Sequence, residues 1–145
     1  MATPSIITVL KQDHQTVAAL LAKATATRNG RRRAALYDQI KDALTRHTAF
    51  EEEHLYPVLA QKARSKDMAF EAWEEHGVVK HLLKDLGRTD VDDDHWKAKM
   101  TVLTENVRHH VAEEEAKGGL FAQLRQALDA RTLTDLATDY LAMEA

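Results

Sequence analysis

The chain has 145 residues, 44% of them hydrophobic and 30% charged, and we expect residues 1–145 to form a single domain. The formal net charge of −3 gives no electrostatic reason to expect nucleic-acid binding. Because cysteine is absent, disulfides, iron–sulfur clusters and thiolate metal sites are excluded, and any metal must be held by nitrogen and oxygen atoms. No run of about eighteen apolar residues predicts a membrane span, and no basic leader predicts a signal peptide. We therefore expect a cytoplasmic protein.

The first predicted helix runs from Pro4 to Arg28, between an N-cap at Thr3 and a stop at Asn29-Gly30. Its apolar face recurs at spacings of three and four residues. His14 lies in the middle of that face, where a single histidine is more often a satisfied core residue than a metal ligand.

The stretch His47–Pro57, with the sequence HTAFEEEHLYP, lies in a second predicted helix that begins near Arg32. His47 and Glu51 are four residues apart and share one helix face, and the preceding residues on that face are apolar. An inward-facing carboxylate is costly without a partner, and a metal ion is one candidate. The proline predicts a kink or an end of the helix near Glu53, because it lacks a backbone donor.

The third predicted helix spans Asp67–Leu86, and His76 lies in its apolar stripe. His81 is about 140° around the helix from His76, so we expect it at the surface. The next segment, 88–94, is an acidic linker whose carboxylates suit the start of another helix.

The fourth predicted helix begins near His95 and repeats the histidine–glutamate pattern. Its inward stripe, at spacings of three and four residues, consists of Met100, Leu103, Val107, His110 and Glu114. We therefore match His110 with His47 and Glu114 with Glu51. The alternative match, His109 with Glu113, aligns the two triple-glutamate runs directly and stays open.

The chain ends in a segment that the helical pattern describes less well. Gly118-Gly119 is expected to loosen the fourth helix before Leu120-Phe121, the counterpart of Leu55-Tyr56. A last short helix is predicted over Leu133–Met143, with Thr132 as its cap. Four main helices with short links indicate an all-α fold, an up-down four-helix bundle with a short C-terminal fifth helix.

Each of the four main helices places a histidine on its buried stripe, and two of them add a glutamate. The candidate metal ligands are His14, His47, Glu51, His76, His110 and Glu114. They are too many for a closed tetrahedral zinc site and suit two first-row ions bridged by Glu51 and Glu114, with iron favoured over manganese. Open coordination positions would remain for a small molecule such as dioxygen. The alternative is a metal-free bundle in which buried histidines and glutamates pair with each other.

The sequence resembles the hemerythrin-like proteins, the HHE cation-binding domain family, over nearly its whole length. The motifs that carry the resemblance are DHQTV around His14, HTAFEEEHLYP from His47, EEHGVVKHLL around His76, and HHVAEEE followed by LF. The resemblance implies a non-haem di-iron centre with carboxylate and oxo or hydroxo bridges in a four-helix bundle, reacting with dioxygen or related small molecules. It implies the same six ligands.

Two departures from the family pattern concern the site. Oxygen-carrying hemerythrins have a second histidine four residues after the one on the third helix, and that position here is Lys80. A ligand is then missing, unless a local bulge brings in His81. Ala122 replaces the usual proline of the second motif, and the glycine pair adds about two residues before Leu120. These changes make Glu114 the least secure of the six.

The main functional prediction is a protein that binds or senses dioxygen, nitric oxide or peroxide at the di-iron centre. The alternatives are a catalase-like or peroxidase-like enzyme that removes peroxide, and an iron-binding or storage role. Acid–base residues for turnover could come from Glu52, His54, Tyr56 or Glu115, and Phe50 and Trp73 are candidate pocket walls. The sequence predicts no oligomeric state.

Overall fold

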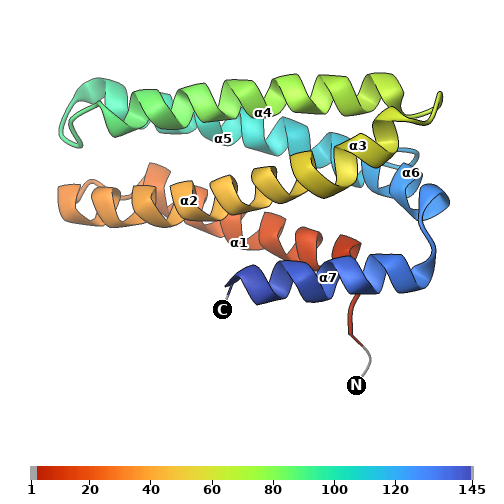
Figure 1. The fold of residues 1–145 in the computed structure, drawn as a ribbon. Coiled ribbons are helices and arrows are strands. Elements are labelled where there is room, and N and C mark those ends of the chain that lie inside the picture. The colour runs from red at the N-terminus through yellow and green to blue at the C-terminus, as the bar shows by residue number, and fades with distance from the viewer. Residues whose placement is uncertain (1–2, 145) are drawn as a thin grey trace.

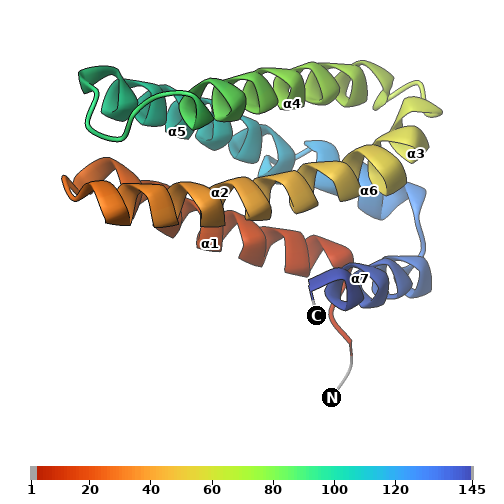
Figure 2. The same cartoon turned by 60° about the vertical axis from the view of Figure 1, so that its left-hand side comes forward.

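The computed structural model describes residues 3–144, and its long helices form an up-down bundle (Figure 1). The four bundle helices are α1 (Ile6–Ala26), α2 (Gly30–Phe50), α4 (Lys66–Gly87) and α5 (Asp94–Glu115). In Figures 1 and 2 they run side by side, with α4 and α5 above α1 and α2. The predicted all-α class and bundle architecture are confirmed. No helix among the described residues is long and apolar enough to cross a membrane.

Side-chain caps fix the helix starts, two of which differ from the predicted positions. Ser5, not Thr3, caps α1, because its hydroxyl accepts a hydrogen bond from the backbone N–H of Ile7. Asn29 caps α2 through the N–H of Arg32, so that α2 begins two residues earlier than predicted. At α5 the acidic linker behaves as expected, since Asp93 accepts from the N–H of His95.

The helical backbone that begins with α2 continues past Pro57. A π-helix, labelled η1, spans Glu51–Leu55, and α3 (Tyr56–Ala60) continues directly from it. The N–H of Tyr56 donates to the carbonyl of Glu51, five residues back, which is the spacing of a π-helix. The predicted kink near Glu53 is thus a wider helical turn, which accommodates the proline without ending the helix.

The C-terminal segment forms two helices, α6 (Leu120–Ala127) and α7 (Ala130–Glu144), where one short helix was predicted. The turn before α6 requires its glycines, because Gly118 has a φ of 79° and a Cβ at position 119 would lie 2.2 Å from the Glu113 carbonyl oxygen. Asp129, not Thr132, caps α7 by accepting from the N–H of Thr132. α7 packs along α1, outside the four-helix bundle (Figure 2).

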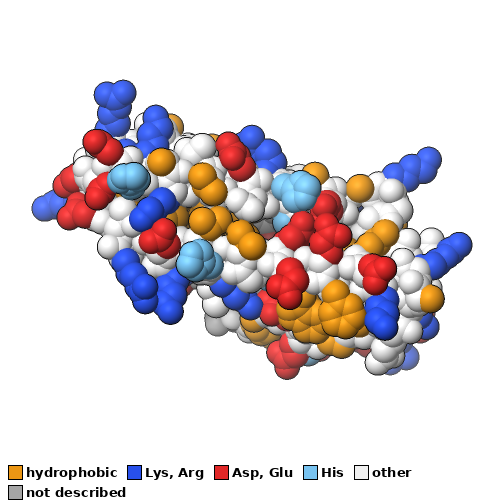
Figure 3. Space-filling model, turned by 90° about the horizontal axis from the view of Figure 1, so that it is seen from above, with side chains coloured by type: hydrophobic (Ala, Val, Ile, Leu, Met, Phe, Trp, Pro, Cys, Tyr) orange, Lys and Arg blue, Asp and Glu red, His pale blue; other side chains and the backbone are white. Residues whose placement is uncertain are grey.

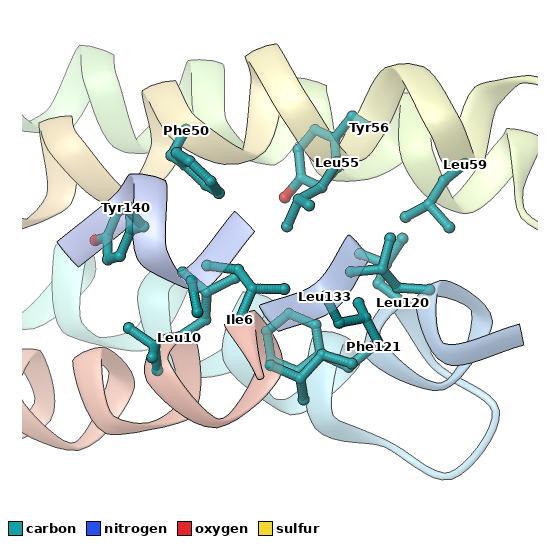
Figure 4. Close-up of a cluster of buried hydrophobic side chains, with 14 of the residues drawn as sticks. Ile6, Leu10, Phe50, Leu55, Tyr56, Leu59, Leu120, Phe121, Leu133 and Tyr140 are labelled. Atoms are coloured by element: carbon teal, nitrogen blue, oxygen red, sulfur yellow. The ribbon is translucent and has the colours of Figure 1, made fainter. Parts of the chain in front are cut away.

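The apolar core is divided into two clusters. The first, at the end of the bundle covered by α3, α6 and α7, contains Leu10, Phe50, Tyr56 and Phe121 and is drawn in Figure 4. The second lies at the opposite end and is built from the other halves of the four bundle helices. It contains Val17, Leu21, Ile40, Leu44, Val79, Leu83, Trp96, Met100, Leu103 and Val107, among others. α1, α2 and α4 contribute residues to both clusters and α5 to the second, and the predicted site residues lie between the two clusters.

Candidate metal centre

All six predicted site residues come together in one polar layer between the two apolar clusters. They are buried, with Glu51 and Glu114 0% exposed and His14, the most exposed of them, 8% exposed. α1 contributes His14, α4 contributes His76, and α5 contributes His110 with Glu114. His47 lies near the end of α2, and Glu51 follows at the start of η1. The four helix faces therefore meet at one depth in the bundle.

The six side chains form two histidine pairs joined by the two glutamates. We call His14 and His47 the first pair, and His76 and His110 the second pair. Glu51 Oε1 lies 3.2 Å from His47 Nε2 and 3.3 Å from His76 Nε2. Glu114 Oε1 lies 3.1 Å from His14 Nε2 and 3.4 Å from His110 Nε2. Each glutamate thus reaches both pairs, as the predicted bridging role requires.

Every one of these histidines also has a carboxylate at its other ring nitrogen. The Nδ1 atoms of His14 and His47 lie 2.6 Å from Glu115 and 3.2 Å from Asp13. The Nδ1 atoms of His76 and His110 lie 3.0 Å from Glu52 and 2.7 Å from Glu75. We call Asp13, Glu52, Glu75 and Glu115 the outer carboxylates.

Outer carboxylates of this kind fix the imidazole with Nδ1 protonated, so that the lone pair on Nε2 faces the centre. Each outer carboxylate directly precedes or follows one of the six site residues in the sequence. The sequence prediction considered Glu52 and Glu115 only for acid–base roles and did not identify Asp13 or Glu75.

The donor atoms fit a metal ion better than they fit each other. Among the described residues, His14 Nε2, His47 Nε2, Glu51 Oε2 and Glu114 Oε1 are buried and make no hydrogen bond. Unsatisfied buried polar atoms are costly, and four in one layer call for a common partner. The separations of 3.1–3.4 Å match neighbouring ligands of one ion, which lie about 3.0–3.4 Å apart when each is about 2.1 Å from the metal.

Electrostatics distinguish the two glutamates. Burial and the negative charge of Glu51 raise the pKa of Glu114 to about 7. The pKa of Glu51 is held well below its usual range, because the attraction of His47 and hydrogen bonds outweigh the effect of burial. The metal-free centre therefore keeps one proton on Glu114 at mildly acidic pH, as expected for two close carboxylates. His110, hydrogen-bonded to Glu75, has its pKa raised to about 9 despite burial.

Tyr56 is the further site residue that the sequence did not assign to the metal. Its hydroxyl oxygen lies 3.0 Å from His76 Nε2 and 3.3 Å from His110 Nε2. The same oxygen lies 3.4 Å from Glu51 Oε1 and 3.4 Å from Glu114 Oε2. Tyr56 is five residues after Glu51, which an α-helix would place about 140° away, and the π-helix brings both onto the site.

The first pair has an aromatic neighbour of a different kind. The ring of Phe121 stacks on His14 with centroids 5.6 Å apart and an angle of 9° between the planes. Leu120-Phe121 was predicted to correspond to Leu55-Tyr56. Tyr56 contacts the second pair where Phe121 contacts the first.

The residues kept as alternatives lie outside this layer. His109 is two-thirds exposed and lies 2.9 Å from Glu113 and 3.4 Å from Glu75, forming a surface group. Figure 3 shows acidic side chains gathered around a histidine on the face formed by α4 and α5. His81 is exposed, and no bulge turns it inward. Lys80 instead forms an ion pair with Glu52, 2.8 Å away.

The remaining residues considered in the sequence have structural surroundings. His54 is partly exposed and its ring contacts Phe50, which belongs to the apolar core. Trp73 donates from its indole N–H to Glu52, at 3.0 Å, and therefore supports an outer carboxylate.

The family model for the hemerythrin HHE cation-binding domain matches residues 5–117. The chain belongs to this family. A protein of Nostoc sp. (strain PCC 7120 / SAG 25.82 / UTEX 2576) named DNA nickase is 27% identical to this hemerythrin-like chain over 137 residues. The alignment covers 94% of the chain and 38% of that relative, so the chain spans less than half of the relative's length. No solved structure matches the chain. The family and the clustered histidines and glutamates identify a hemerythrin-like protein suited to metal binding.

Proposed function

We propose that the six buried residues hold two iron ions, bridged by Glu51 and Glu114. The observation that carries this proposal is the pair of glutamates whose oxygens each reach one histidine of both pairs at 3.1–3.4 Å. Imidazole and carboxylate donors suit iron first and manganese second. The outer carboxylates would hold each imidazole in the tautomer that metal binding needs.

We propose Tyr56 as a fifth protein donor at the second pair. Its oxygen has the same spacing to His76, His110 and the glutamates as those donors have to each other. It would take the place left by the missing family histidine, because Lys80 turns to Glu52 instead. The ion at the first pair, with four protein donors, would then keep the more open coordination.

The centre would bind or sense dioxygen or a related small molecule such as nitric oxide or peroxide. The two ions, when bound, supply electrons to such a molecule or accept them from it. The chain itself orients the imidazoles and surrounds the layer with two apolar clusters that exclude bulk water. We propose that residues 1–145 act as one domain, since α7 packs against α1; residues 1–2 and 145 lie outside the described part.

A peroxide-removing enzyme is the second candidate, and Glu115 favours it. Its carboxylate lies 2.6 Å from His14 Nδ1, and its side chain is 35% exposed. It connects the first pair to solvent and could carry a proton inward during turnover. An iron-storage role has no comparable support, because the layer has donors for about two ions.

The metal proposal is tested by producing the protein with iron supplied and measuring the number of iron ions per chain. We expect about two iron ions per chain, and less than about one, with no other metal, would overturn the proposal. His110→Ala should lower the iron content by weakening the position at the second pair, whereas the matched surface change His109→Ala should leave it intact. Loss of iron in the His109 variant alone would reverse the assignment on α5.

Two mixing experiments separate the binder from the enzyme. The reduced protein is mixed with dioxygen, and the oxidised protein is mixed with hydrogen peroxide. A reversible optical change with dioxygen and no loss of peroxide supports binding or sensing. Rapid release of dioxygen from peroxide supports the enzyme, and replacing Glu115 by glutamine should then slow it.

Nucleic-acid cleavage is named for the Nostoc relative, and we propose that this chain does not share it. The chain has 23 acidic and 20 basic residues, and a group of acidic side chains gathers on part of the α4–α5 face (Figure 3). Of the three consecutive arginines, Arg33 is buried and donates to the carbonyls of Thr27 and Val91. Supercoiled plasmid incubated with the iron-loaded protein should remain uncut, and metal-dependent nicking would contradict this.

A further inference from the structure

The last helix, α7, reaches the candidate metal centre although it carries none of the six site residues. It lies against α1, outside the bundle, and beyond residues 5–117 that the family model matches (Figures 1 and 2). Its buried face consists of Leu133, Ala137 and Tyr140, and Tyr140 is 0% exposed. In Figure 4 Tyr140 lies at one edge of the apolar cluster, below Phe50, and the two ring centroids are 4.8 Å apart.

A chain of hydrogen bonds leads from this tyrosine to the centre. The Tyr140 hydroxyl donates to Asp13 Oδ2. The same oxygen accepts from His47 Nδ1 at 3.2 Å, and the opposite ring nitrogen of His47 lies 3.2 Å from Glu51 Oε1. Two side chains therefore separate the Tyr140 ring from the glutamate that spans both histidine pairs.

This arrangement differs from that of the other outer carboxylates. Glu52 receives hydrogen bonds from Trp73 and Lys80, and Glu75 contacts His109, all on helices that carry site residues. Asp13 has its hydroxyl partner on α7 instead. Because Tyr140 and His47 share one oxygen atom, the phenol restricts the rotamer of Asp13 and thereby the orientation of the imidazole.

We infer that Tyr140 is a positioning residue for His47, so that docking of α7 and occupancy of the metal centre stabilise each other. This inference rests on the proposed function, because it requires a metal ion on His47. The coupling is reciprocal: if docked α7 strengthens metal binding, bound metal must strengthen docking of α7 by the same factor. Loss of the metal then loosens a helix at the surface, which is a means of signalling the state of the centre.

Hydrogen–deuterium exchange of the α7 amides, in iron-loaded and iron-free protein, measures this coupling directly. We expect amide exchange in α7 to be about three- to tenfold faster without iron. This factor is smaller than the change of about 10–100-fold in metal affinity expected when a direct hydrogen-bond partner of a metal-bound histidine is removed, because Tyr140 acts through Asp13. Tyr140→Phe removes only the hydroxyl. It should weaken iron binding by a similar factor, make α7 exchange insensitive to iron, and shift the visible absorption of the iron-loaded protein.

Tyr37→Phe is the matched control, because the Tyr37 hydroxyl donates to the Leu83 carbonyl at 2.6 Å, between α2 and α4. It removes a comparable hydrogen bond without touching Asp13. Equal α7 exchange with and without iron overturns the inference, and so does equal iron affinity in the two variants. Failure of the wild type to bind iron instead overturns the proposed function, and iron analysis reports that separately.

Discussion

The two histidine pairs occupy matching places in the bundle but have different chemical surroundings. The first pair lies beside the phenyl ring of Phe121, and the second pair has the phenol oxygen of Tyr56 at 3.0 Å from His76. The two aromatic residues follow equivalent glutamates, one across a π-helix and the other across a Gly-Gly turn. The two motifs are similar in sequence, but the hydroxyl oxygen of Tyr56 and the different connections after the two glutamates make the two pairs chemically unequal.

In the proposed di-iron centre, this inequality would divide the roles of two ions that share the same bridging glutamates. The ion at the second pair would have more protein donors and so be less open. The ion at the first pair, next to the solvent-connected Glu115, would be the one that a small molecule reaches. Changes that act on both pairs and changes that act on one should therefore give different results.

Removing a glutamate should have the largest effect and should act on both pairs at once. We expect Glu51→Gln and Glu114→Gln each to lower iron affinity by more than about 100-fold, since each removes a shared anionic donor. Iron per chain and the optical spectrum measure this. Retention of one tightly bound iron in either variant would show that this glutamate serves one position only.

The outer carboxylates should produce the next largest effect, and here the pairs can be separated. Glu115→Gln removes the carboxylate beside His14, and Glu75→Gln removes the one beside His110. Each change should weaken iron binding by about 10–100-fold, at its own pair. Competitive titration with a chelator should then show one weakened iron and one unchanged. Two equally weakened ions would argue against distinct positions.

The metal-free protein should lose stability as the pH rises from about 5 to about 9. In the folded chain the pKa of Glu114 is raised from 4.5 to about 7, and that of His110 from 6.5 to about 9. The folded state therefore keeps protons that the unfolded state has released, and their stabilisation disappears as the pH passes the folded values. We expect a decrease of several kcal/mol in the free energy of unfolding, measured by urea denaturation. Rising stability across this range would contradict the protonation of Glu114.

Tyr56→Phe should have the smallest thermodynamic effect but the clearest signature at the second pair. A phenolate bound to ferric iron gives a visible charge-transfer band, and we expect that band in the wild type and its absence in the variant. Iron affinity should fall by about tenfold or less, because four donors remain. Phe121→Leu is the matched change at the first pair and should leave the band unchanged. An identical spectrum in Tyr56→Phe would remove the tyrosine from the donor set.

The helical periodicity of the sequence was sufficient to predict the bundle and the meeting of the six residues. His110 could be chosen over His109 because Val107 and Leu103 precede it at the offsets that Leu44 and Ile40 have from His47. The structure places His110 in the core and His109 at the surface. Whether the six residues bind metal, and which metal, stays a prediction.

Other parts of the site could not be predicted, because they depend on features that a regular helix lacks. Asp13 and Glu75 lie beside site residues in the sequence, but their partners are histidines on other helices. Only the packing of the bundle brings these residues together. A sequence signal was available nonetheless: an acidic residue adjoins His14, Glu51, His76 and Glu114, and this recurrence could have indicated the outer carboxylates. Tyr140 offered no such signal, since the path of α7 is set by the two turns before it.

The π-helix at Glu51–Leu55 absorbs one residue more than an α-helical turn holds, so the tyrosine contact depends on the backbone hydrogen-bond pattern as well as on the side chain. In a regular α-helix of the same length, Tyr56 would lie about 140° around the axis from Glu51, and the phenol would leave the second pair. Deleting one residue between Glu52 and Leu55 would instead restore α-helical spacing with the tyrosine four residues after Glu51, on the same helix face. In evolution, one codon lost at this point would thus remove the π-helix and keep the phenol at the centre.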